Sequence, residues 1–287
     1  MAKQPLRDLT GKLIVITGGA RGIGAATARA LSAKGAKVVI GDLDEELTQR
    51  VAGQMGGGVV GYRLDVTDHA GFTKMLDQVE ADHGPIYALV NNAGIMPLAL
   101  IEEESEATMD RQIAINLAGV IHGTREAVKR MKPRRSGHIV NVASMAGKLG
   151  TPGASTYCAT KHGVVGLCES VFFELKPHNV DVTCIMPTIV KTELAAGLKK
   201  SALSGQVEPE DVAKAIVKSL QKPKLEVSVP SHLAVMTRTI RFFPHGVAEA
   251  FFKIGDQGNL LASAAHSPAR DAYEARAIES APGLSEL

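Results

Sequence analysis

The stretch that decides the fold is Leu13-Ile14-Val15-Ile16-Thr17-Gly18-Gly19-Ala20-Arg21-Gly22-Ile23-Gly24-Ala25-Ala26. Its apolar run breaks into glycines and resumes with small residues, which predicts a strand, a tight turn and the N-terminus of a helix. Gly18, Gly22 and Gly24 would allow positive φ angles, close approach of a phosphate to the main chain, and tight packing of the helix on the strand. The free N–H groups of that helix N-terminus would face the anion. Such turns also occur without a ligand, so whether this one binds a phosphate has to be judged from the rest of the chain.

Seven apolar runs have the length and the boundaries of strands: 13–16, 37–40, 59–64, 86–90, 138–142, 180–186 and 225–229. Helical patterns lie between them, at 23–34, 68–83, 105–131, 155–175 and 208–220. This alternation predicts an α/β fold, a single doubly wound Rossmann-type domain over residues 1–230 with a parallel seven-stranded sheet. Residues 231–287 would form a C-terminal extension that is helical and then, from about residue 263, partly disordered.

Composition narrows the class of protein. The chain has 287 residues, 45% of them hydrophobic, and a formal net charge of +2, which suits one large core and argues against a nucleic-acid-binding surface. Cys158, Cys168 and Cys184 form no CxxC pair, which favours a reduced, intracellular protein. The N-terminal region carries only the short run 13–16, so neither a secretory signal nor a membrane span is expected and a cytoplasmic location is predicted.

Two carboxylates follow predicted strands. Asp42, about twenty residues after the glycine turn, is placed to accept both ribose hydroxyls of the adenosine half of a dinucleotide. Its charge would repel a 2′-phosphate and therefore favours NAD over NADP. Alternatively, Asp42 caps the next helix, a role for which Asp44 competes. Asp65, next to Val66, ends the third strand and could meet the adenine amino group.

Amides stand at two further places. Asn91 and Asn92 follow the fourth strand, where they would either tie neighbouring strands together or line the cofactor. Asn116 lies within the apolar face of the helical stretch 105–131. A buried amide without partners costs a few kcal/mol, so Asn116 is either a structural bracket or part of a polar site.

Tyr157 and Lys161 are four residues apart in a predicted helix and share one of its faces. A cation beside the phenol would lower the pKa of Tyr157 toward neutrality, which a general acid/base for a carbonyl–alcohol pair requires. The spacing alone is weak because any helix can show it by chance. Ser144, just beyond the carboxyl end of the preceding strand, strengthens the assignment.

Together these motifs resemble those of the short-chain dehydrogenase/reductases over residues 8–230. The matching positions, in family order and spacing, are Thr17 to Gly24, Asp42, Asp65, Asn91 to Gly94, Asn116, Ser144, Tyr157, Lys161 and Pro187 through Thr192. The resemblance implies hydride transfer with a nicotinamide cofactor. Tyr157 would be the catalytic acid/base, Ser144 would bind the substrate oxygen, Lys161 the nicotinamide ribose, and Asn116 a water of the proton relay. It also implies a homo-oligomer, a dimer or a tetramer, often built on the helices of Asn116 and Tyr157.

The cofactor contacts predicted in this way are Gly18, Arg21, Gly22, Ile23, Gly24, Asp42, Asp65, Val66, Asn92, Tyr157, Lys161, Thr188 and Thr192. Two of these positions complicate the resemblance. Pro187-Thr188 stands where the family usually has Pro-Gly, so the turn near the nicotinamide carries a side chain. Arg21 is of the kind associated with NADP preference, but Asp42 confronts the extra phosphate directly. NAD is therefore the predicted cofactor and NADP the less favoured one.

The segment 189–205, which in this family folds over the substrate, is rich in leucine and alanine. It suits a lipophilic secondary alcohol, ketone or aldehyde of steroid-, retinoid- or acyl-like type, and it equally suits simple packing. Residues 232–254 hold four of the 7 phenylalanines beside basic residues. Packing on a neighbouring subunit is favoured for them over closure of the substrate pocket or association with a membrane surface.

Other chemistries have little support. The histidines lack HExxH or Cys/His ligand spacing, so no metal is expected. Ser144 lacks a Gly-x-Ser-x-Gly surrounding, which argues against a hydrolase. The remaining alternatives are a non-catalytic nicotinamide-binding redox sensor and an NADP-dependent carbonyl reductase.

Overall fold

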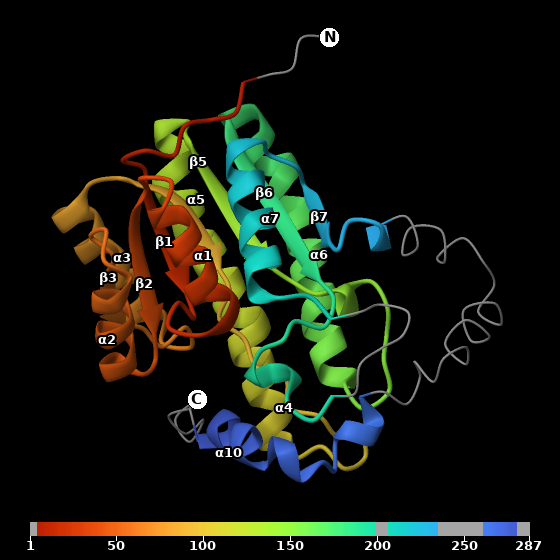
Figure 1. Cartoon of the computed structure of the whole chain (residues 1–287). Coiled ribbons are helices and arrows are strands. Elements are labelled where there is room, and N and C mark those ends of the chain that lie inside the picture. Colours follow the sequence, from red (N-terminus) through yellow and green to blue (C-terminus); the bar gives the residue numbers. More distant parts are fainter. Residues whose placement is uncertain (1–4, 199–205, 235–260, 280–287) are drawn as a thin grey trace.

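The computed structural model describes residues 5–198, 206–234 and 261–279 (Figure 1). Within these residues the strands form one parallel sheet in the order β3-β2-β1-β4-β5-β6-β7. The strands are β1 (Leu13–Thr17), β2 (Lys37–Asp42), β3 (Val60–Arg63), β4 (Ile86–Asn91), β5 (Gly137–Val142), β6 (Val180–Pro187) and β7 (Glu226–Val229). The predicted doubly wound α/β fold with seven parallel strands is confirmed.

Helices cover both faces of the sheet (Figure 1). They are α1 (Gly22–Ser32), α2 (Glu45–Met55), α3 (His69–His83), α4 (Glu106–Ile113), α5 (Gly119–Arg134), α6 (Ser155–Leu175), α7 (Pro209–Gln221) and α10 (Asp271–Glu279). Along β1, Leu13 and Val15 pack into the core shared with α3, α5 and α6, whereas Ile14 and Ile16 pack into the core shared with α1 and α7. A parallel sheet buried on both faces needs apolar residues on both sides of each strand, which explains the continuous apolar runs.

Three local features differ from the predicted elements. The stretch expected as one helix over 105–131 is two helices joined by a π-helical turn, Ala114–Ala118. Helix α2 had no predicted range, because only Thr48 and Ala52 of its side chains are buried and its apolar pattern is weak. Residues 262–279, where partial disorder was expected, form two short 3₁₀ turns and α10.

Residues 261–279 are called the C-terminal segment below. It lies beyond the carboxyl ends of the strands, beside α4 (Figure 1). The phenylalanine-rich stretch, for which three interpretations compete, falls mostly at 235–260 and lies outside the described residues. Among the helices that the structure describes, none combines the length and the apolar character needed to cross a membrane.

Candidate active site

The turn after β1 is built so that only glycine fits. Gly18 and Gly22 have φ angles of 62° and 47°, in the left-handed region that side chains disfavour. A Cβ on Gly18 would lie 2.8 Å from the Cα of Ala93, and one on Gly24 would collide with the carbonyl oxygen of Gly18. The turn is therefore pressed against the end of β4, and Gly24 packs behind it.

Asn92 and Thr17 hold this turn in place. The Thr17 hydroxyl accepts hydrogen bonds from the N–H groups of Asn92 and Ala93, both at 3.0 Å. The Asn92 side-chain amide donates to the carbonyls of Thr17 and Gly18, again at 3.0 Å. Asn91 similarly donates to Asn141 of β5 at 2.8 Å. Both asparagines thus tie strands together, and Asn92 does so while lining the cleft described next.

A cleft of about 710 Å³ follows the carboxyl edge of the sheet. Its volume is in the range of cofactor sites, and the glycine turn gives a ligand direct access to backbone N–H groups. The cleft therefore fits a dinucleotide. Nine of the residues predicted to bind the cofactor line it: Gly18, Arg21, Gly22, Ile23, Asp42, Asp65, Val66, Asn92 and Thr192.

Asp42 lies at this cleft and its carboxylate accepts a hydrogen bond from the Ala20 N–H at 3.0 Å. Burial raises the pKa of Asp42. The alternative in which Asp42 caps α2 is wrong, because Asp44 is the N-cap and accepts from the Leu47 N–H at 3.0 Å. Asp44 also pairs with Arg21 at 3.0 Å. Asp42 is thereby left at the end of β2 without a helix to cap.

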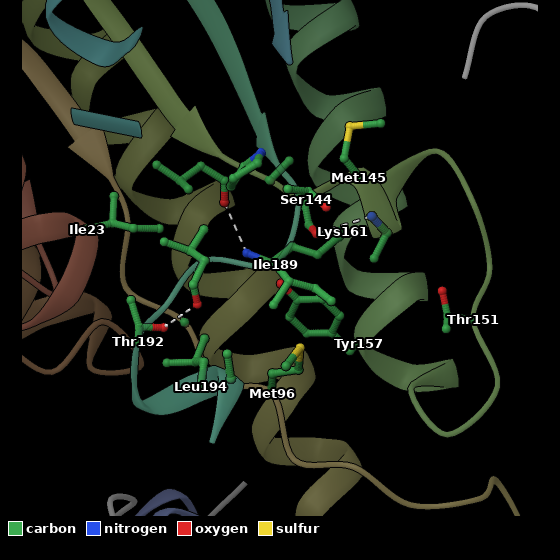
Figure 2. A pocket seen from close by; sticks show the side chains of 18 of the residues that line it. Ile23, Met96, Ser144, Met145, Thr151, Tyr157, Lys161, Ile189, Thr192 and Leu194 are labelled. Atoms are coloured by element: carbon green, nitrogen blue, oxygen red, sulfur yellow. Dashed lines mark hydrogen bonds between the residues drawn. The ribbon is translucent and has the colours of Figure 1, made fainter. Parts of the chain in front are cut away.

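A second cavity of about 220 Å³ adjoins the cleft, and both are lined by Ile23, Asn92, Gly94, Thr192 and Leu194. Ser144, Tyr157 and Lys161 converge on this cavity from the end of β5 and from α6 (Figure 2). Thr188 lines it as well, and its N–H is used in a 2.8 Å bond to the carbonyl of Val229. The remaining wall is apolar except for Thr151: Met96, Val142, Ala143, Met145, Ala146, Leu149, Pro187, Ile189, Val190, Ala195, Leu198, Leu233 and Leu261.

Polar contacts connect the members of this cluster with one another and with the backbone nearby. Lys161 Nζ donates to the carbonyl of Val142 at 3.0 Å and lies 5.6 Å from the centroid of the Tyr157 ring. The Ser144 hydroxyl forms a hydrogen bond with Tyr157 and accepts from the Ala146 N–H at 3.1 Å. Tyr157 can thus exchange a proton with a substrate oxygen placed beside it, with Ser144 and Lys161 close by.

The expected lowering of the Tyr157 pKa is not what the structure gives. Burial raises the pKa of Tyr157 to about 12, although the hydrogen bond from Ser144 opposes this rise. Burial also lowers the pKa of Lys161 to about 8. At neutral pH Tyr157 is therefore a neutral phenol that can donate a proton, beside a lysine that is still mostly charged. The sequence could show the neighbouring cation but not the burial that raises the pKa of Tyr157.

Asn116 is fully buried in the π-helical turn. Its amide donates to the carbonyl of Ile95 and accepts from the Ile95 N–H, both at 2.8 Å. The side chain therefore serves as a bracket between the turn and the loop after β4. Gly94 lies between Asn116 and Lys161, since a Cβ there would be 3.1 Å from Asn116 Oδ1 and 3.6 Å from Lys161 Nζ.

One part of the site had no signal in the sequence. Tyr273, Arg276 and Ala277 of α10 line the dinucleotide cleft, in a stretch where composition predicted disorder. In the described residues, no three His, Cys, Asp or Glu side chains gather as a metal ion would require.

The family profile described as short chain dehydrogenase matches residues 12–202. The chain belongs to the short-chain dehydrogenase/reductase family. It is 38% identical, over 213 residues, to a 3-alpha-(or 20-beta)-hydroxysteroid dehydrogenase of Mycobacterium tuberculosis, covering 73% of this chain and 82% of that protein. It is 36% identical to (+)-borneol dehydrogenase 1 of Salvia officinalis, covering 69% of this chain and 76% of that protein.

The solved structure of a short chain dehydrogenase/reductase from Burkholderia phymatum in complex with NAD superposes with a TM-score of 0.75. It is 26% identical, and the match covers 81% of this chain and 94% of that chain. This short-chain dehydrogenase/reductase is therefore an oxidoreductase of a family that uses NAD(P).

Proposed function

We propose that this short-chain dehydrogenase/reductase transfers hydride between NAD and a lipophilic secondary alcohol, ketone or aldehyde of steroid-, retinoid- or acyl-like type. The proposal is supported mainly by one observation, that the dinucleotide cleft and the smaller cavity adjoin each other. The dinucleotide cleft opens into a mostly apolar cavity, and Ser144, Tyr157 and Lys161 meet in that cavity. An apolar wall with a few converging polar groups suits a lipophilic substrate with one reacting oxygen.

The roles of the residues follow from their positions. When bound, the nicotinamide supplies or accepts the hydride. The Tyr157 hydroxyl donates a proton to the carbonyl oxygen during reduction and takes it back during oxidation. Ser144, hydrogen-bonded to Tyr157, orients the substrate oxygen, while the charge of Lys161 stabilises the phenolate that forms as the proton leaves. Because its side chain is paired with Ile95, Asn116 would act on a relay water through its backbone.

The names of two relatives support the substrate class, since a hydroxysteroid dehydrogenase and a borneol dehydrogenase are both named for lipophilic alcohols. A 3-oxoacyl-(acyl-carrier-protein) reductase, FabG of Haemophilus influenzae, is 33% identical over 72% of this chain and 90% of that protein, and it supports the acyl alternative. Asp42 supports NAD, because a carboxylate at the end of β2 would repel a 2′-phosphate.

The same proposal includes a homo-oligomer. Ile113, Ile121 and Phe173 are 42%, 43% and 69% exposed, and they lie on the helices α4, α5 and α6 through which such an assembly is expected. Burying these side chains against a second copy would remove apolar surface from water.

A panel of lipophilic alcohols, followed by NADH absorbance, tests the proposal with the wild type, Tyr157→Phe and Ser144→Ala. Tyr157→Phe is expected to lower kcat by about 10²–10⁴-fold, the usual contribution of a general acid/base, while NADH binding stays within about threefold. Full turnover by Tyr157→Phe would contradict the mechanism. A wild type that binds NADH but oxidises none of the panel would favour the redox-sensor alternative.

A further inference from the structure

One buried arginine attaches the C-terminal segment to the site. Arg270 is only 1% exposed. Its guanidinium donates to the carbonyls of Leu194 and Ala196 at 2.9 Å and to that of Met96 at 2.7 Å, and its Nε pairs with Glu274 at 2.9 Å. A buried guanidinium is stable only when its donors are satisfied. Arg270 therefore joins the C-terminal segment to the loop after β4 and to the 193–198 segment over the cavity.

Three further bonds fix the position of α10. The Met96 N–H donates to the Tyr273 hydroxyl at 2.7 Å, and the Leu98 N–H donates to Glu274 at 3.3 Å. Near the other end of the helix, Arg111 of α4 donates to the carbonyl of Ala277 at 2.9 Å. These bonds hold helix α10 beyond the carboxyl ends of the strands (Figure 1). There it forms one wall of the dinucleotide cleft.

The wall presents one charged group to the cleft. Arg276 lines the cleft and pairs with Glu193 at 3.0 Å. Glu193 Oε1 also lies 3.7 Å from Nη1 of Arg21, which belongs to the glycine turn. The side chains of all three are about half exposed, between 46% and 51%. A single carboxylate therefore stands between an arginine from the glycine turn and an arginine from α10, at the mouth of the cleft.

We propose that Arg276 is a cofactor-binding residue, which contacts the pyrophosphate of the dinucleotide from the side opposite the glycine turn. The inference rests on the proposed dinucleotide site. Backbone N–H groups at the α1 N-terminus bind one side of a pyrophosphate, and its other side keeps charged oxygens that a guanidinium binds well. Glu193 and the phosphates would compete for Arg276, and the half-exposed position of Arg276 leaves it free to exchange partners.

The test measures the binding of four probes by calorimetry: NADH, NADPH, ADP-ribose, which keeps the pyrophosphate, and adenosine, which lacks it. Arg276→Ala is expected to weaken ADP-ribose and NADH about tenfold, as for loss of one charge-assisted contact at a half-exposed site. Binding of adenosine should stay unchanged, and Arg276→Lys should recover most of the loss. Arg29→Ala is the matched control. Arg29 of α1 is also about half exposed and pairs with Glu210 of α7, and it does not line the cleft.

Equal affinity of Arg276→Ala and the wild type for ADP-ribose would overturn the inference. It would also be overturned by an equal loss for adenosine, which would mean a change in the shape of the adenosine pocket, and by a loss confined to NADPH, which would mean a contact to the 2′-phosphate. If the wild type binds neither NADH nor NADPH, both the proposed function and this inference are contradicted. Binding by the wild type without turnover would affect only the proposed function.

Discussion

Replacing Asp42 with asparagine is expected to reduce the preference for NAD over NADP by about two orders of magnitude. Asparagine keeps an oxygen that can accept from the Ala20 N–H, which Asp42 binds at 3.0 Å. The local fold should therefore survive, and the change isolates the negative charge.

The magnitude follows from the charge and the position of Asp42. Two unit charges about 4 Å apart interact with about 4 kcal/mol at an effective dielectric constant of about 20, and exposure of the cleft to solvent and salt reduces this to about 2 kcal/mol. Relief of that repulsion should tighten NADP about 30-fold. Loss of a charged acceptor for the ribose hydroxyls should weaken NAD by about 1 kcal/mol, or about fivefold. The ratio of the two dissociation constants would then change by about 150-fold.

The assay is a fluorescence titration of NADH and NADPH on the wild type, Asp42→Asn and Asp68→Asn. Asp68 is the matched control, because it carries the same charge and accepts from the Gly71 N–H at 2.9 Å as the N-cap of α3. The reasoning fails if Asp42→Asn and the wild type show the same ratio, or if the wild type prefers NADPH. Because burial raises the pKa of Asp42, acidification should protonate this carboxylate earlier than an ordinary aspartate and weaken the wild-type preference in the same direction.

Three further outcomes are expected. Burial lowers the pKa of His138 from 6.5 to about 4. Between pH 6.5 and pH 4 the imidazole of His138 therefore becomes protonated in the unfolded chain but not in the folded one. The free energy of unfolding should drop by about 2–3 kcal/mol as the pH falls across that window. Urea titrations at pH 7 and 4.5 should show His138→Gln losing about that much less than the wild type. Gly24→Ala, whose Cβ would collide with the Gly18 carbonyl, should cost about 1–3 kcal/mol in urea and weaken NADH binding; an unchanged midpoint would contradict the packing argument. Ile121→Glu with Phe173→Glu should give a smaller species in light scattering; an unchanged mass would remove α5 and α6 from the interface.

The sheet could be predicted from the sequence because of how its strands are buried. Central strands such as β1 and β5 are buried on both faces, and the apolar runs end at residue types that break them, such as Gly18 after β1 or Asp65 after β3. The candidate site could be predicted for the same reason. Residues that line the dinucleotide cleft, such as Asp42 and Asn92, stand at strand ends, and parallel strands bring their carboxyl ends to one edge. The local sequence was therefore enough to predict the half of the site that lies at the carboxyl edge of the sheet.

The other half of the site depends on long-range contacts that no local pattern encodes. Arg270 is nearly inaccessible, although arginine is among the residues least often buried. Its carbonyl partners at Met96, Leu194 and Ala196 are backbone groups that every residue has. The composition of this alanine-rich stretch therefore predicts disorder. Composition shows how few large apolar residues the stretch has, but it does not show the hydrogen-bond partners that stabilise a buried arginine such as Arg270.

Arg21 was the main argument for NADP, and its surroundings weaken that argument. Its guanidinium is shared between Asp44 at 3.0 Å and Glu193 at 3.7 Å, so part of its charge is already neutralised. The described residues that line the cleft include four carboxylates, Asp42, Asp44, Asp65 and Glu193, and three cationic side chains, Arg21, Lys191 and Arg276. A 2′-phosphate would bring nearly two more negative charges into this excess, whereas a free ribose would bring only hydroxyls that the carboxylate of Asp42 can accept. This charge balance adds to the effect of Asp42 and supports the proposed preference for NAD.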